Sequence, residues 1–137
     1  MSSTITAVDH IGVAVERIED VLPFYEKALG LNLEEIKESK VNKVRGAILS
    51  AGRTRIELIE PLGKEGPLSN FLRKKGQGIH HIAFEVSNLE MMLKRLKKDG
   101  IALIDEKPRI GIKGAKIAFL HPKATGNVLI ELCEEQR

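Results

Sequence analysis

Hydrophobic positions follow the same order in two stretches of the chain. Each stretch begins with a short run rich in β-branched residues, at 9–15 and 79–86, which predicts a strand. Apolar residues then recur at spacings of three and four, which predicts an amphipathic helix ended by Gly30 in the first stretch and by Gly100 in the second. Further strands are predicted at 33–38, 43–50 and 53–59, and at 102–105, 116–120 and 128–133.

The two stretches are copies of one βαβββ repeat. His10 aligns with His81, and Glu57 aligns with Glu131. We expect a first repeat at about residues 6–60, a connector at about 61–77 with a short helix, and a second repeat at about 78–134. Because each repeat is too small to bury a core alone, we expect one domain over residues 1–137. The predicted fold is α+β: two tandem βαβββ units that form a cupped mixed sheet around a metal cleft.

Composition excludes several classes of function. The chain has 22 Lys and Arg against 19 Asp and Glu, a net charge of +3, and few aromatic side chains for stacking nucleic-acid bases. A single cysteine, Cys133, excludes an internal disulfide and a cysteine zinc site. We see neither a signal-peptide pattern nor an apolar run long enough to span a membrane, so we expect a cytoplasmic protein.

The repeat places equivalent polar residues on equivalent strands. Glu57 and Glu131 each lie inside an apolar run, so each points to the face opposite its apolar neighbours. Both could simply face solvent. However, packing two related repeats about a pseudo-twofold axis would gather both glutamates with His10 and His81, a donor set that suits a divalent metal. We favour the metal site; His80 should face the other way.

Five segments resemble the vicinal oxygen chelate superfamily and, within it, the methylmalonyl-CoA epimerases. The resemblance runs from residue 9 to residue 132, and its more specific parts are the Gly-Ile-His-His strand and the His-Pro-Lys segment before GNVLIEL. The matching segments are DHIGVAV (9–15), RIELIEP (55–61), GIHHIAFEV (78–86), DEKPRIGIKGAKIAFLHPK (105–123) and GNVLIEL (126–132).

This resemblance implies a ligand set and a reaction. The ligands would be His10, Glu57, His81 and Glu131, and the ion a divalent metal, with Co2+ favoured over Mn2+, Ni2+, Zn2+ or Mg2+. The reaction would interconvert (R)- and (S)-methylmalonyl-CoA by moving the proton on C2 through a metal-stabilised enolate. It also implies an acyl-CoA partner and a homodimer. From the sequence itself we expect no nucleic-acid partner, since no recognised binding motif is present, and no membrane partner.

The proton-transfer base is less defined. Some epimerases carry a glutamate where this chain has Gly46 or a near neighbour, and no carboxylate lies between Lys40 and Arg53. We favour Glu131 as both ligand and base, while Glu57 or a water at the metal are alternatives.

Basic residues of the second repeat are candidates for holding the substrate. We name Lys113, His121 and Lys123, with Arg109 and Lys116 nearby, although such side chains are often solvated surface groups. Gly111 and Gly114 fit a loop over the cleft, or a plain hairpin turn.

Other functions of the same superfamily compete with this one. Glyoxalase I (lactoylglutathione lyase) is the strongest rival, because its bacterial members also use two histidines and two glutamates. An extradiol dioxygenase would leave Glu57 unexplained. A non-catalytic small-molecule binding protein of the same fold would often lack the metal ligands.

Overall fold

The computed structural model describes residues 2–134 and 136, and it divides into two compact units. We call residues 10–80 the first unit, and residues 1–9 together with 81–137 the second unit. Each is described by itself below. None of the described helices is long and apolar enough to cross a membrane.

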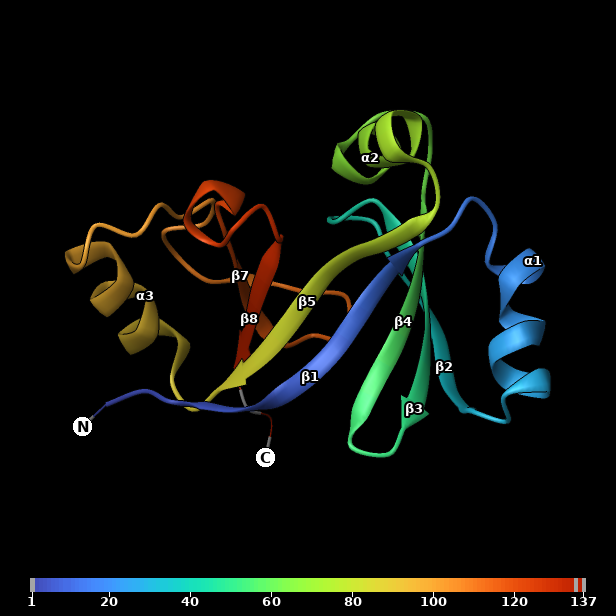
Figure 1. The fold of residues 1–137 in the computed structure, drawn as a ribbon, viewed down its shortest axis with the longest axis horizontal. Coiled ribbons are helices and arrows are strands. Elements are labelled where there is room, and N and C mark those ends of the chain that lie inside the picture. Colours follow the sequence, from blue (N-terminus) through green and yellow to red (C-terminus); the bar gives the residue numbers. More distant parts are fainter. Residues whose placement is uncertain (1, 135, 137) are drawn as a thin grey trace. The chain divides into compact units, whose positions relative to one another are not determined.

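The first unit is a four-stranded mixed sheet in the order β2-β3-β4-β1, with helices at its side and end (Figure 1). Strand β1 pairs in parallel with β4, and the other neighbours are antiparallel. The elements are β1 (Ile5–Ala14, residues 10–14 in this unit), α1 (Ile18–Pro23), the π-helix η1 (Phe24–Ala28), β2 (Asn32–Ser39), β3 (Val44–Ala51), β4 (Thr54–Pro61) and α2 (Pro67–Lys75).

The second unit repeats that plan, with the strand order β5-β8-β7-β6. Strand β5 pairs in parallel with β8, as β1 does with β4. The β8–β7 and β7–β6 pairs are antiparallel. The elements are β5 (Gly78–Val86, residues 81–86 in this unit), α3 (Leu89–Lys98), β6 (Arg109–Ile110), β7 (Lys116–Leu120), the 3-10 helix η2 (Pro122–Ala124) and β8 (Ile130–Glu134). The predicted α+β class and the βαβββ order are therefore confirmed.

One face of each sheet forms a core with a helix. In the first unit α1 lies against β3 and β4, and in the second unit α3 lies against β7 and β8 (Figure 1). Each fully buried leucine or isoleucine in such a cluster contributes about 1.5–3 kcal/mol. The buried residues are Val15, Ile18, Ala47, Leu49 and Leu58 in the first unit, and Val86, Leu89, Met92, Leu93, Ala118, Leu120 and Leu132 in the second.

Helix α3 is bounded as the sequence predicts. The side-chain oxygen of Asn88 accepts a hydrogen bond from the Met91 backbone N–H at 3.0 Å, which satisfies one of the donors exposed at a helix start. The helix ends before Gly100, whose φ of 78° lies in the left-handed region that favours glycine.

The first predicted helix changes its form at Pro23. The chain is α-helical over Ile18–Pro23 and continues as a π-helix over Phe24–Ala28, where the Leu29 N–H donates to the Phe24 carbonyl at 3.0 Å. Proline has no N–H and its ring crowds the preceding turn, which favours such a wider turn.

The strand predicted at residues 102–105 is wrong. Only Leu103 forms a bridge there, with Leu120, and the paired strand lies later, at Arg109–Ile110. The physical reason is Asp105, whose Oδ2 accepts the Phe119 N–H at 2.9 Å. A strand partner would offer a backbone carbonyl to that N–H, so the carboxylate interrupts the ladder.

Candidate metal centre

The first unit carries a buried histidine–glutamate pair on the sheet face opposite α1. Strand pairing sets Gly12 beside Glu57, and His10 lies two residues earlier on the same face. His10 Nδ1 lies 3.2 Å from Glu57 Oε2, and the two residues are 3% and 2% exposed. The two side chains lie within ion-pair distance, yet Oε2 of Glu57 accepts no hydrogen bond from the described residues, which is unusual for a carboxylate oxygen buried this deeply.

The second unit carries the equivalent pair in the same local framework. Ala83 pairs with Glu131 as Gly12 pairs with Glu57, and His81 lies two residues before Ala83. His81 Nε2 lies 3.3 Å from Glu131 Oε1, and both residues are 5% exposed. The ring of Phe119, the β7 partner of Glu131, packs edge-to-face on His81 with centroids 5.7 Å apart, which holds the imidazole in place.

Both pairs have the chemistry and spacing of metal ligands. Imidazole nitrogen and carboxylate oxygen bind divalent first-row metals at about 2.0–2.2 Å, so two ligands at a right angle lie about 3 Å apart. The 3.2 Å and 3.3 Å separations match that distance. Within each unit, the residues present therefore fit half of a two-histidine, two-carboxylate site.

Lys113, a predicted substrate contact, lies in the turn between β6 and β7. Its Nζ lies 3.1 Å from Oδ2 of Asp9, and the two side chains are only 20% and 12% exposed. The sequence interpretation passed over Asp9, although its place immediately before His10 was a usable signal.

The other two predicted substrate contacts occupy an exposed turn. His121 precedes η2, and its Nδ1 accepts the backbone N–H of Lys123 at 3.1 Å, as a helix cap does. Both side chains are exposed. His80, which the sequence placed away from His81, belongs to the first unit, where its ring packs edge-to-face on Phe71 at 4.8 Å.

Gly46 lies on the same sheet face as Glu57. It is buried on β3 and pairs with Ile59, while Ile48, two residues on, pairs with Glu57. A side chain at position 46 would therefore project from the face that carries the histidine–glutamate pair.

Cys133 is buried on the corresponding face of the second unit, with Ala83 and Ile117. Burial raises the pKa of its thiol well above the ordinary range, and the Asp9 and Glu131 carboxylates raise it further, while Lys113 opposes them. The thiol is therefore kept protonated, and it is inert as a nucleophile.

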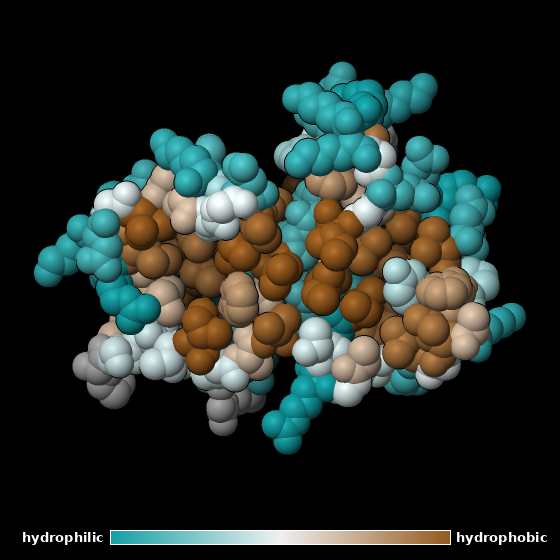
Figure 2. Space-filling view, in the orientation of Figure 1, coloured by the Kyte–Doolittle hydropathy of each residue, from teal (hydrophilic) through white to brown (hydrophobic). Residues whose placement is uncertain are grey.

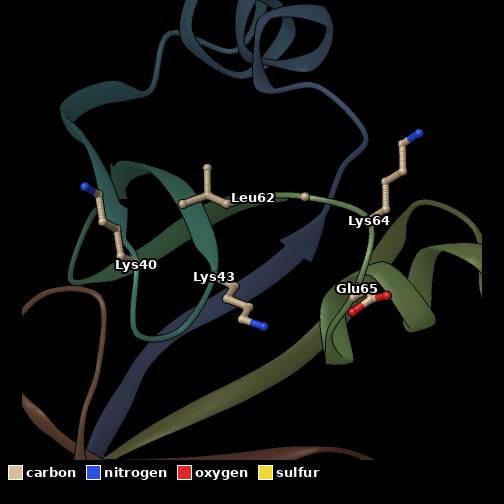
Figure 3. A pocket seen from close by; sticks show the side chains of 6 residues that line it. Lys40, Lys43, Leu62, Lys64 and Glu65 are labelled. Atoms are coloured by element: carbon tan, nitrogen blue, oxygen red, sulfur yellow. The ribbon is translucent and has the colours of Figure 1, made fainter.

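A separate open pocket of about 370 Å³ lies in the first unit, at the loops that follow β2 and β4 (Figure 3). Lys40, Lys43 and Lys64 line it with Glu65. Figure 3 shows the side chains of Lys40 and Lys64 pointing away from each other, so their ammonium groups do not converge on one ligand position. The pocket therefore offers mainly positive surface charge.

This chain is similar to known proteins in both sequence and fold. The sequence profile of the Glyoxalase/Bleomycin resistance protein/Dioxygenase superfamily matches residues 9–119. Human mitochondrial methylmalonyl-CoA epimerase is 37% identical over 91% of this chain and 72% of its own. The Mycobacterium tuberculosis methylmalonyl-CoA epimerase crystal structure has a TM-score of 0.93 at 34% identity, covering 100% of this chain and 93% of its own. A methylmalonyl-CoA epimerase in complex with methylmalonyl-CoA and NH4+ has a TM-score of 0.91 at 30% identity, covering 96% of both chains.

Proposed function

Since this chain belongs to the glyoxalase/bleomycin resistance protein/dioxygenase superfamily and is an isomerase of its methylmalonyl-CoA epimerase family, we propose that it interconverts (R)- and (S)-methylmalonyl-CoA with the help of a divalent metal. The observation that carries this proposal is the buried histidine–glutamate pair found once in each unit. A relative crystallised with methylmalonyl-CoA supports an acyl-CoA as the substrate.

The proposed ligands are the two pairs together: His10 and Glu57 from the first unit, and His81 and Glu131 from the second. Support comes from their equivalent strand positions and their matching separations. When bound, a divalent cation supplies positive charge that stabilises the thioester oxygen as C2 loses its proton. The mixed nitrogen and oxygen donors suit Co2+, with Mn2+, Ni2+, Zn2+ and Mg2+ as the other ions to test.

Glu131 is the proposed base. It takes the proton from C2 on one of its carboxylate oxygens, and epimerisation is completed when a proton is delivered to the opposite face of the same carbon, either by an acid on that face or by the same carboxylate after it has moved. His81 and Phe119 fix the position of this carboxylate, and its burial excludes the water that would solvate it. Glu57 is the alternative base, because the repeat gives it the same relation to a histidine.

The rest of the proposal concerns the residues that contact the substrate, the oligomeric state and the cellular location. Lys113, His121 and Lys123 are the proposed substrate contacts. We propose a homodimer, which is consistent with the apolar side chains that reach the surface over each unit (Figure 2), among them Phe24, Leu29 and Val41 in the first unit. A cytoplasmic location is consistent with a free, buried cysteine.

The decisive experiment follows the C2 proton. The purified, cobalt-loaded protein is incubated with methylmalonyl-CoA in deuterated water, and deuterium at C2 is measured by mass spectrometry. We expect exchange that stops when a chelator removes the metal and returns when Co2+ is restored. Absence of exchange together with turnover of the methylglyoxal–glutathione adduct would identify a glyoxalase I instead. Binding without either turnover would identify a non-catalytic member of the superfamily.

Two variants then distinguish the bases. Glu131→Gln and Glu57→Gln both keep an oxygen donor but remove the basic carboxylate. We expect E131Q to lower exchange by at least about 100-fold, including after saturation with Co2+, with E57Q retaining more activity. If both variants exchange at the wild-type rate, neither glutamate is the base.

A further inference from the structure

We propose that Lys113 holds the free carboxylate of the acyl-CoA substrate and that Asp9 is a positioning residue for the Lys113 ammonium. The inference rests on the proposed function, and it names the group that makes the site selective: a carboxylate attached to C2 of a malonyl-type thioester. Neutral acyl-CoA esters lack that group.

The first observation is that the Lys113 side chain is largely withdrawn from solvent. Lysine ammonium groups are seldom withdrawn from water without a partner, yet this side chain is only 20% exposed. It lies 3.1 Å from Asp9 Oδ2. An ammonium group has three N–H donors in different directions, so Asp9 can hold one of them while a substrate carboxylate accepts another.

The turn that carries Lys113 is fastened to the sheet face of Glu131. The Gly111 N–H donates to the Ala115 carbonyl at 2.9 Å, and the Gly114 N–H donates to the Gly111 carbonyl at 3.0 Å. Gly111 also lies close against Ile117, because a Cβ at position 111 would be only 3.0 Å from Ile117 Cγ2. Ile117 packs with Ala83, the strand partner of Glu131, so the turn has little freedom to move away from that face.

The groups that the proposal joins belong to one compact unit. Asp9, Lys113 and Glu131 all lie in the second unit, and Ile117 packs with Ala83, the strand partner of Glu131.

The chemistry of the substrate explains why a cation is needed there. A carboxylate on C2 adds negative charge beside the carbon that must lose a proton to Glu131, so it opposes both the approach of the base and formation of the enolate. An ammonium on that carboxylate offsets the repulsion in both steps.

The test compares the binding of two thioesters by calorimetry on the metal-loaded protein. Malonyl-CoA has the carboxylate, and propionyl-CoA replaces it with a methyl group. We expect Lys113→Met to lower the malonyl-CoA preference by about tenfold or more, while propionyl-CoA affinity stays unchanged. Lys113→Arg should retain the preference, and Asp9→Asn should lower it by a smaller factor that Asp9→Glu partly restores.

The matched control is Lys97→Met, which removes an exposed lysine of the second unit that also pairs with a carboxylate, that of Glu106. It should leave the preference unchanged. Equal weakening of both thioesters in K113M, or an unchanged preference, would overturn the inference. Should K113M fail to fold, Lys113→Gln replaces it in the same comparison. Absence of C2 exchange in the wild-type protein refutes the proposed function separately, because the binding ratio is measured without turnover.

Discussion

Gly111 lies so close to Ile117 that a single added methyl group should strain the second unit. A Cβ at position 111 would lie 3.0 Å from Ile117 Cγ2 and 3.1 Å from Cδ1. Carbon atoms in a packed interior prefer about 3.5–4.0 Å. Ile117 is only 7% exposed, so its side chain cannot swing into solvent to relieve the contact. We therefore expect Gly111→Ala to lower the free energy of unfolding by about 1–3 kcal/mol.

A double-mutant cycle separates this contact from backbone effects. Ile117→Ala removes the atoms that the new methyl group meets, so adding Gly111→Ala in that background should cost less than about 0.5 kcal/mol. Gly114→Ala is the control: nothing lies within 4 Å of its Cβ, but its φ of +85° disfavours any side chain. Its cost, about 1 kcal/mol, should be the same with either residue at position 117.

The free energies would come from urea unfolding followed by circular dichroism. The packing argument would be refuted if the losses of unfolding free energy caused by Gly111→Ala and Ile117→Ala simply add in the double variant. It would also be refuted if Gly114→Ala showed the same coupling energy with Ile117→Ala as Gly111→Ala does. A functional readout accompanies the stability one. Because the turn carries Lys113, Gly111→Ala should weaken malonyl-CoA binding more than propionyl-CoA binding.

Three further predictions concern other parts of the chain. Asn88→Ala should cost about 1 kcal/mol of unfolding free energy through the lost cap of α3, whereas Asn88→Asp should restore most of it. Iodoacetamide at pH 8 should label Cys133 at least about tenfold more slowly in the folded protein than in guanidinium, because a raised pKa depletes the thiolate; equal rates would contradict this. Removing the metal with a chelator should lower the Tm and Co2+ should restore it, but Co2+ should not raise the Tm of His10→Ala.

Much of the fold follows from periodicity in the sequence. Alternation within the runs around Glu57 and Glu131 predicts which side chains share a face, because a strand has a period of two. The repeat adds that each glutamate has the same relation to a histidine, and the 3.2 Å and 3.3 Å pairs agree with this. Glycines at 30 and 100 mark the helix ends, since both have positive φ.

Two features could not be predicted from the sequence, because each depends on a contact made by a single side chain. The carboxylate of Asp105 takes an N–H that a strand partner would normally satisfy, so the apolar run at 102–104 does not become a strand. In the sequence Asp9 looks like any polar residue of a strand. Its contact with Lys113 cannot be predicted, because the two residues are far apart along the chain. Periodicity carries no information on such distant pairs.

The division of the structure does not coincide with the duplication in the sequence. Residues 1–9 precede the first repeat's histidine, yet they belong to the compact unit formed by residues 81–137, and Ser3 accepts the Arg95 guanidinium on its backbone oxygen. Cutting the gene at the connector would therefore give two halves, of which the second lacks a strand segment and Asp9. A circular permutant that joins residue 137 to residue 1 and opens the chain between residues 80 and 81 would instead keep residues 81–137 continuous with residues 1–9. Engineered halves of this protein should therefore be drawn on that boundary.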